Sequence, residues 1–276
     1  MAENLHHRGF QLCSLPSNSA ALSLKKNGNI NIILLGKTGV GKSSTGNTIL
    51  GEKRFRFKKS LKSVTQFCEV GKSVVEGRHV SVVDTPGFFD TKHEEEELAL
   101  EIAKCVFLST PGPHAFLYVL PVERFTEQEE MVWQIMKMMF GEGVLKHLIL
   151  LFTNGDDIDL KAFESEVNEC EKLRNIVSSC QGYHVFNNKD QNNREQVNDL
   201  LQKIDTMIEQ NGGGHYSNQM FEEAKRIKQE EDKSSCRCFG CRCECAFKRF
   251  WQNFKEFFRG IAHTMCIKRK NPYRPL

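Results

Sequence analysis

A glycine-rich segment with one lysine and one serine is the part of this chain best suited to chemistry. It reads G-x-x-x-x-G-K-S over residues Gly36, Lys37, Thr38, Gly39, Val40, Gly41, Lys42 and Ser43. An apolar run, Ile30–Leu35, precedes it, and residues 44–50 after it can form a helix. A strand that turns through glycines into a helix N-terminus aims backbone N–H groups at one point, where a phosphate binds. Glycine is needed because the backbone must adopt positive φ and approach the ligand closely.

This phosphate loop, residues 36–43, predicts a nucleoside polyphosphate as the ligand. Lys42 would reach the β- and γ-phosphates, and Ser43 would bind Mg²⁺. We count Ser44, the next residue, among the nucleotide-binding positions. The alternative is an ordinary glycine-rich turn between a strand and a helix.

Two further segments are suited to the γ-phosphate and the metal ion. The apolar run Val80–Val83 leads into D-x-x-G, in which Asp84 would hold Mg²⁺ through water and the Gly87 N–H would meet the γ-phosphate. Thr65, within Ser63–Gln66, is placed to complete the Mg²⁺ coordination when a γ-phosphate is bound. A plain turn and an exposed threonine at a strand edge are the alternatives.

The base is expected to bind after the next two apolar runs. Leu148–Thr153 leads into Asn154, Gly155, Asp156 and Asp157, where GTPases commonly show N-K-x-D. Asp157 would accept hydrogen bonds from the guanine ring N–H and amine. Glycine at the lysine position removes a side chain that packs along the base, which predicts weaker binding, and Asp156 is a rival for the reading role. Asn187 and Asn188 end the run that starts at Tyr183, and they would contact the base or simply form a turn.

Hydrolysis is predicted to be slow. Phe88 stands directly after D-x-x-G, where Ras-type enzymes carry a glutamine that orients the attacking water. Positioning and charge stabilisation supply most of the catalysis of phosphoryl transfer. Arg124 or His114 could act across a dimer, but both residues are equally compatible with surface or core roles.

Together these motifs resemble the GIMAP family, the immunity-associated GTPases of the AIG type. The likeness is carried by GKTGVGKSSTGNTILG, SVTQFCEV, VVDTPGFFDT, FTNGDD and FNNKD over residues 29–210, and by a family box at Val119–Glu129. It implies a Ras-like G domain related to septins and chloroplast import GTPases, in an immune or cell-survival setting. It also implies low turnover and GTP-dependent dimers or oligomers at membranes. Family members usually carry a basic residue or histidine in the second or third place of the fourth nucleotide motif, here residues 154–157, so Gly155 is a departure.

The expected fold is α/β: a P-loop, Ras-like G domain with a mostly parallel sheet, one antiparallel strand and helices on both faces. The antiparallel strand follows from a turn at Glu76–Gly77. Helical spacing occupies 96–108, 127–140, 160–176, 193–208 and 218–233. We divide the chain into a leader (1–28), a G domain (29–212) and a C-terminal extension (213–276).

Charge and cysteines are concentrated in the extension. Residues 233–276 carry eleven basic and two acidic residues, so they contribute +9 to a net charge of +3, and the rest of the chain is −6. Six of the eleven cysteines lie beyond residue 235, and the others are scattered without a disulfide pattern. We find no secretory signal and no run long enough to span a membrane. These features predict a soluble cytoplasmic protein with reduced thiols.

The extension combines a cysteine cluster with an amphipathic helix. Cys236–Cys245 holds five thiols, for which Zn²⁺ binding, S-acylation and free thiols remain open. Beyond it, bulky side chains recur at helical spacing: Phe247, Phe250, Trp251, Phe254, Phe257, Phe258 and Ile261. This aromatic stripe, with basic residues beside it, favours peripheral binding to an anionic membrane surface. Packing against the G domain or a dimer partner, and calmodulin-type binding, are the alternatives. Nucleic acid is not expected as a partner.

The sequence therefore predicts a protein that binds GTP or GDP with Mg²⁺, hydrolyses GTP slowly, forms a homodimer or homo-oligomer and acts at the cytosolic face of a membrane. A nucleotide-gated scaffold with negligible hydrolysis is the alternative function. An ATP-preferring P-loop enzyme is a further one, against which Asp157 argues.

Overall fold

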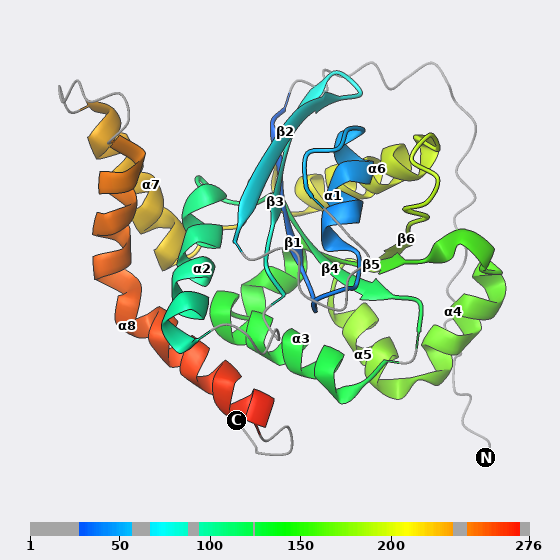
Figure 1. The fold of residues 1–276 in the computed structure, drawn as a ribbon. Coiled ribbons are helices and arrows are strands. Elements are labelled where there is room, and N and C mark those ends of the chain that lie inside the picture. Colours follow the sequence, from blue (N-terminus) through cyan, green and yellow to red (C-terminus); the bar gives the residue numbers. More distant parts are fainter. Residues whose placement is uncertain (1–27, 57–66, 88–93, 124, 234–241, 271–276) are drawn as a thin grey trace, which may run out of the picture.

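The computed structural model describes residues 28–56, 67–87, 94–123, 125–233 and 242–270 (Figure 1). Several predicted features lie outside these ranges: the leader up to residue 27, Thr65, Phe88, Arg124 and most of the cysteine cluster.

One six-stranded sheet in the order β2-β3-β1-β4-β5-β6 forms the centre of the fold (Figure 1). The strands are β1 (Ile30–Leu35), β2 (Glu69–Val75), β3 (Arg78–Asp84), β4 (Ala115–Pro121), β5 (Leu148–Thr153) and β6 (Tyr183–Val185). All neighbours are parallel except β2 and β3, which form a hairpin. Glu76 and Gly77 at its tip have φ of 50° and 74°, as a tight hairpin turn requires. The predicted mixed sheet is confirmed.

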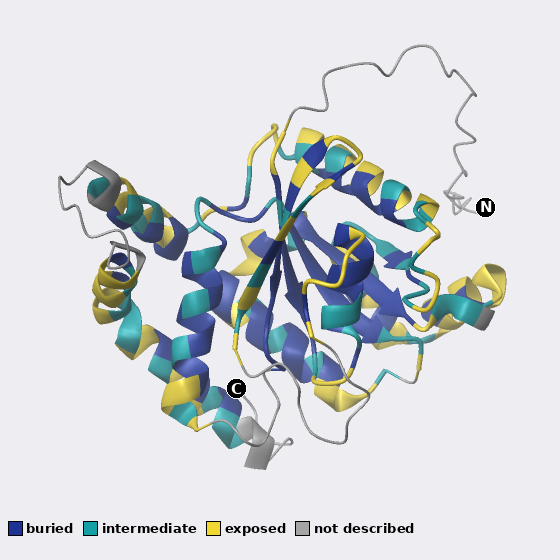
Figure 2. Cartoon of the chain, turned by 45° about the horizontal axis from the view of Figure 1, so that its top comes forward, coloured by how far each residue is buried: buried dark blue, intermediate teal, exposed yellow. Residues whose placement is uncertain are grey.

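Helices cover both faces of the sheet. They are α1 (Lys42–Leu50), α2 (Glu95–Leu108), α3 (Glu127–Phe140), α4 (Leu160–Glu169), α5 (Glu171–Ser179), α6 (Glu195–Gln210), α7 (Gln219–Lys233) and α8 (Arg242–Lys270), with short 3₁₀ turns η1 (Glu142–His147) and η2 (Gly155–Asp157). Side chains of α1 and α6 form one apolar cluster with the sheet, and those of α2, α3, α4 and α5 form another on the opposite face. The central strands are buried on both sides, as Figure 2 shows.

The helix expected over 160–176 is two helices. Cys170 is extended, with φ −79° and ψ 98°, and it ends α4 and begins α5. Val167 and Leu173 are both buried, yet six residues on a straight helix would turn them about 120° apart. The break lets both side chains reach the same core.

The aromatic stripe of α8 packs against the G domain. Phe250, Phe258 and Ile261 are buried in the cluster that includes α2, and the Phe107 ring of α2 lies 5.4 Å from that of Phe247 and 5.7 Å from that of Phe250. In Figure 1, α7 and α8 stand together on the outer side of α2. Packing against the G domain, one of the alternatives that the sequence left open, is therefore the arrangement in this structure.

Polar contacts join α8 to the start of α2. Arg259 Nη2 lies 2.5 Å from Glu96 Oε1, and His263 Nδ1 lies 3.0 Å from Glu95 Oε2, both at the start of α2. Exposed pairs of this kind contribute little each, so the apolar contacts carry most of the docking. Within the described residues, no helix is both long and apolar enough to cross a bilayer.

Candidate nucleotide-binding site

The predicted nucleotide-binding residues that the structure describes gather at one edge of the sheet. β1, β3, β4, β5 and β6 run parallel, so their carboxyl ends meet at the same edge. The phosphate loop follows β1, Asp84 ends β3, Asn154 follows β5, and Asn187 and Asn188 follow β6. Ligands of open α/β sheets bind at such carboxyl ends.

The phosphate loop has the backbone shape that its glycines predict. Gly39 and Gly41 have φ of 87° and 96°, and Gly36 has φ of 145°. A Cβ added at Gly36 would lie 2.5 Å from the Val119 carbonyl oxygen of β4. The loop therefore approaches β4 more closely than any side chain at position 36 would allow.

The Lys42 side chain folds back onto the phosphate loop. The residue is 6% exposed, and its Nζ donates to the carbonyl oxygens of Gly36 (3.1 Å) and Lys37 (2.8 Å). Burial lowers the pKa of Lys42 from 10.5 to about 8, although the charge of Asp84 acts in the opposite direction. A polyphosphate in the loop would offer this ammonium stronger acceptors than two carbonyl groups.

Ser43 and Asp84 bring two oxygen ligands together. The Ser43 hydroxyl donates to Asp84 Oδ2 at 2.5 Å, and Asp84 is 1% exposed. The Thr85 hydroxyl beside them donates to the Leu34 carbonyl oxygen at 2.7 Å, which ties the ends of β3 and β1. A hydroxyl and a carboxylate are hard ligands of the type that Mg²⁺ prefers. The donor set therefore fits the metal ion that the sequence predicts.

Gly87 lies directly against the phosphate loop. A Cβ at this position would stand 1.8 Å from Thr38 Oγ1 and 2.5 Å from the Thr38 backbone nitrogen. Only glycine allows the D-x-x-G segment to come this close to the loop.

Gly155 also occupies a position without room for a side chain. Its N–H donates to the Phe186 carbonyl oxygen at 3.1 Å, and an added Cβ would lie 2.4 Å from Cγ1 of Val185. The neighbouring Asn154 is exposed and has φ of 66°. The departure from N-K-x-D is therefore matched to the end of β6, where Val185 fills the space that a larger residue would need. The backbone of Asp157 ends η2.

The loop after β6 is fastened to the helix that follows the phosphate loop. Asn188 accepts a hydrogen bond from the Thr48 hydroxyl (2.8 Å) and donates to that of Thr45 (3.1 Å), both on α1. The Asn187 side chain accepts from the Lys189 N–H at 2.9 Å and so shapes its own turn. Lys189 in turn forms an ion pair with Asp156 of the loop after β5. The predicted contacts of Asn187 and Asn188 with a base stay predictions.

Two supporting residues escaped the sequence reasoning. The Thr153 hydroxyl donates to the Val40 carbonyl oxygen at 2.8 Å and joins the end of β5 to the phosphate loop. The Asn47 side chain of α1 donates to the Phe55 carbonyl oxygen and accepts from the Phe55 N–H, both at 2.8 Å. Thr153 stands directly before the fourth motif, which was its available signal, whereas Asn47 has none in a single sequence.

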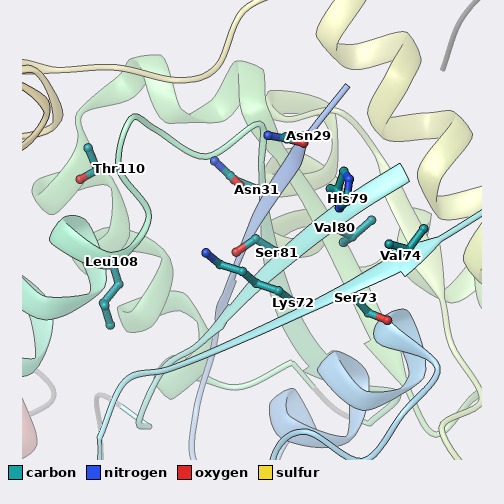
Figure 3. A pocket seen from close by; sticks show the side chains of 10 residues that line it. All are labelled: Asn29, Asn31, Lys72, Ser73, Val74, His79, Val80, Ser81, Leu108 and Thr110. Carbon is teal, nitrogen blue, oxygen red and sulfur yellow. The ribbon is translucent and has the colours of Figure 1, made fainter. Parts of the chain in front are cut away.

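The residues around a polar cavity of about 320 Å³ come from the opposite end of the strands (Figure 3). They include Asn29 and Asn31 at the start of β1, and Lys72, His79 and Ser81 on β2 and β3. None of them belongs to a predicted nucleotide motif, so this cavity is separate from the nucleotide site.

The fold and the site define a P-loop G domain. A sequence model of the AIG1 family matches residues 30–235, and the chain belongs to this family. The family match confirms the resemblance seen in the motifs, and it extends into α7, beyond the boundary predicted at residue 212.

Relatives and solved structures agree with this assignment. The chain is 37% identical over 213 residues to immune-associated nucleotide-binding protein 9 of Arabidopsis thaliana, covering 73% of this chain and 62% of that protein. It is 33% identical over 193 residues to human GTPase IMAP family member 8, covering 68% and 29%. The chain thus spans less than two thirds of the length of these relatives. The structure of Arabidopsis thaliana Toc33 with Mg²⁺ and GMPPNP aligns with a TM-score of 0.53 at 21% identity, covering 67% of this chain and 86% of that one, which shows a shared fold.

The lowered pKa of Lys42 predicts proton uptake on nucleotide binding. Phosphates would favour the charged ammonium and raise its pKa above the value of about 8 that burial gives it. Affinity should therefore fall as pH rises through 8, and binding at about pH 8.5 should take up most of one proton, against little at about pH 7. Calorimetric titration in two buffers with different ionisation enthalpies measures this uptake. Equal, near-zero uptake at both pH values would contradict it.

The contact at Gly155 predicts that restoring a side chain harms the protein. Gly155→Ala should lower the free energy of unfolding by about 1–3 kcal/mol because its Cβ overlaps Val185. Val185→Ala removes the overlapping methyl group, so the double variant should be less destabilised than the two single changes added together. Chemical denaturation measures all three variants. Strictly additive losses would show that the two residues do not compete for space.

Proposed function

We propose that this chain is a GTPase switch that binds Mg²⁺·GTP and hydrolyses it slowly. The observation that carries the proposal is the convergence of Lys42, Ser43 and Asp84 at the carboxyl ends of β1 and β3. This arrangement offers a cation for the phosphates and two oxygen ligands for Mg²⁺. When bound, Mg²⁺ would neutralise charge on the phosphate oxygens.

Guanine as the base is supported by sequence and by likeness. Asp157, at the fourth motif, is of the residue type that accepts from the guanine ring N–H and amine. One relative is named a GTPase, and Toc33 has been crystallised with GDP and Mg²⁺ and with GMPPNP and Mg²⁺. Asn154 follows β5, and Asn187 and Asn188 follow β6, at the same edge of the sheet as the phosphate loop. We expect the base to bind beside them.

Slow hydrolysis and activation by a second copy are part of the proposal. Phe88 cannot orient water, so a residue from a second copy would have to assist hydrolysis. Arg124 is our candidate for that residue across a homodimer. Thr65 would complete the metal coordination, and the Gly87 N–H would contact the γ-phosphate. In the chloroplast translocon components Toc33 and Toc159, dimerisation is important for GTPase activity, which supports the same arrangement here.

A nucleotide-gated scaffold is the second candidate function, and Phe88 is the residue that favours it. In that case GTP binding would drive assembly without measurable turnover.

The names of several relatives associate them with immunity, and we extend this setting to the chain. Reduced survival of immune cells after loss of the protein would support this setting, and unchanged survival would contradict it.

Nucleotide titration and single-turnover kinetics test the switch. Fluorescent GTP and GDP should bind in the presence of Mg²⁺ and be displaced by unlabelled GTP but not by ATP. The observed rate of hydrolysis should be low at low protein concentration and rise with concentration because a second copy assists. Arg124→Ala should abolish that rise, because a catalytic arginine typically accelerates hydrolysis by about 10³-fold or more.

Three outcomes decide between the candidates. Fast hydrolysis independent of concentration would refute activation by a partner. Displacement by ATP as well as by GTP would refute guanine specificity. GTP-dependent assembly with no detectable turnover at any concentration would favour the scaffold.

We also propose that the chain acts at the cytosolic face of an anionic membrane, and that α8 must leave α2 to do so. The stripe that suits a bilayer is packed against Phe107 and its neighbours. Of the stripe, Phe257 is the most exposed at 44%, which is too little apolar surface for firm binding on its own. Basic residues of α8 form ion pairs with acidic neighbours in the docked state, for example Arg249 with Glu230.

Phe107→Ser tests this membrane proposal from the α2 side, leaving α8 unchanged. It should loosen the docking of α8 and raise the fraction of full-length protein that sediments with phosphatidylserine-containing vesicles, but not with neutral ones. Phe257→Ala, at the exposed ring of α8, is the matched control for losing one aromatic side chain away from α2 and should not raise binding. No gain for Phe107→Ser with any nucleotide, despite a loosened α8 in hydrogen exchange, would refute the role of the stripe at membranes.

A further inference from the structure

Glu129 bridges the phosphate loop and the start of α3. It stands at the third position of α3 and is 5% exposed. Its Oε1 accepts a hydrogen bond from Lys37 Nζ at 2.8 Å, and its Oε2 accepts from the Thr126 N–H at 3.0 Å and from the Thr126 hydroxyl. Lys37 is the second residue of the phosphate loop, ninety-two positions away. One carboxylate therefore holds two segments that are far apart in the chain.

Thr153 ties the phosphate loop to the end of β4, the strand that precedes α3. Its hydroxyl donates to the Val40 carbonyl oxygen (2.8 Å) in the phosphate loop and contacts the Leu120 carbonyl oxygen (3.3 Å) at the end of β4. The Thr153 carbonyl oxygen accepts from the Val122 N–H at 3.0 Å. The phosphate loop is thus tied at residue 37 and at residue 40 to the two ends of the connection between β4 and α3.

We propose that Glu129 is a positioning residue for the nucleotide site, which holds the phosphate loop in its binding shape through Lys37. The inference rests on the nucleotide binding proposed above and concerns how the chain prepares for it. Glu129 does not itself touch a phosphate, because its carboxylate is already occupied by Lys37 and Thr126.

The charge of Glu129 points to a role beyond capping the helix. A glutamine at the third helical position closes a capping box as well as a glutamate does. Burial alone would raise the pKa of Glu129, but Lys37 and Thr126 more than offset it, so the pKa lies below its usual range. The side chain is therefore held as a carboxylate, and its charged partner is in the phosphate loop.

The position of Lys37 explains how the effect reaches the ligand. Its backbone carbonyl oxygen accepts from Lys42 Nζ at 2.8 Å, while its side chain is held by Glu129. A phosphate that attracts Lys42 removes this hydrogen bond from the Lys37 carbonyl group. The ion pair with Glu129 then remains to hold residue 37 in place and keep the loop N–H groups aimed at the phosphate.

Three variants separate positioning from capping. Glu129→Gln keeps an acceptor for the Thr126 N–H but removes the charge that faces Lys37. Lys37→Met removes the other partner and keeps an unbranched apolar side chain. Thr126→Ala removes the cap and leaves the ion pair. Glu130→Gln, one residue further on in an exposed pair with Lys172, is the matched control for losing a carboxylate from α3.

Affinity for fluorescent GDP and hydrogen exchange of the phosphate loop are the readouts. Glu129→Gln and Lys37→Met should each raise Kd about five- to tenfold, and the double variant should resemble the single ones because the two residues act through one contact. GTP affinity should fall by the same factor, and kcat at saturating GTP should stay within about twofold because a uniform binding interaction is lost. Exchange over residues 36–43 should rise in both variants without nucleotide.

The opposing results are distinct. Effects of Glu129→Gln and Lys37→Met that multiply in the double variant would refute the shared role. A rise in Kd for Thr126→Ala equal to that for Glu129→Gln would show that Glu129 acts only as a helix cap. A parent chain that binds no guanine nucleotide would instead refute the proposed function.

Discussion

The close approach of the phosphate loop to β4 is the constraint on which the nucleotide site depends. Gly36 leaves no space for a side chain beside the Val119 carbonyl oxygen, so the loop turns directly over the end of the sheet. This turn sets where α1 begins, and therefore where Lys42 and Ser43 stand relative to Asp84. The loops after β5 and β6 are then placed by contacts to the same unit: Thr153 to Val40, and Asn188 to α1.

The phosphate loop buries the side chain of Lys42. Burying an ammonium group costs free energy, and two backbone carbonyl groups compensate only in part, as the pKa of about 8 shows. The oxygens of a bound polyphosphate would lessen that penalty, because they favour the charged ammonium. The charge of Asp84 offsets this penalty only in part, because the pKa of Lys42 stays below its ordinary value.

The sequence was sufficient for the fold, because strands, helices and turns depend on local patterns. The roles of the phosphate and metal residues stay predictions. Apolar runs marked β1, β3, β4, β5 and β6, whereas β2 followed from the turn at Glu76–Gly77, and glycines marked the phosphate loop. The break at Cys170 was missed because apolar residues continue on both sides of it. Gly155 was interpreted as the loss of a lysine, since a single sequence cannot show that Val185 occupies the neighbouring space. The pairing of Lys37 with Glu129 was equally invisible, because it joins residues ninety-two positions apart.

The aromatic stripe of α8 shows the same limit in a form that bears on function. Its periodicity indicates an apolar face but not the surface that this face covers. In this structure the face covers α2, the helix that follows the D-x-x-G segment in the chain, and Arg259 and His263 fit the acidic start of that helix. A membrane would have to compete with a protein surface that already buries Phe250 and Phe258. Membrane binding through this face must therefore be weaker for the whole protein than for the isolated α8 helix. It must also change with any movement of α2.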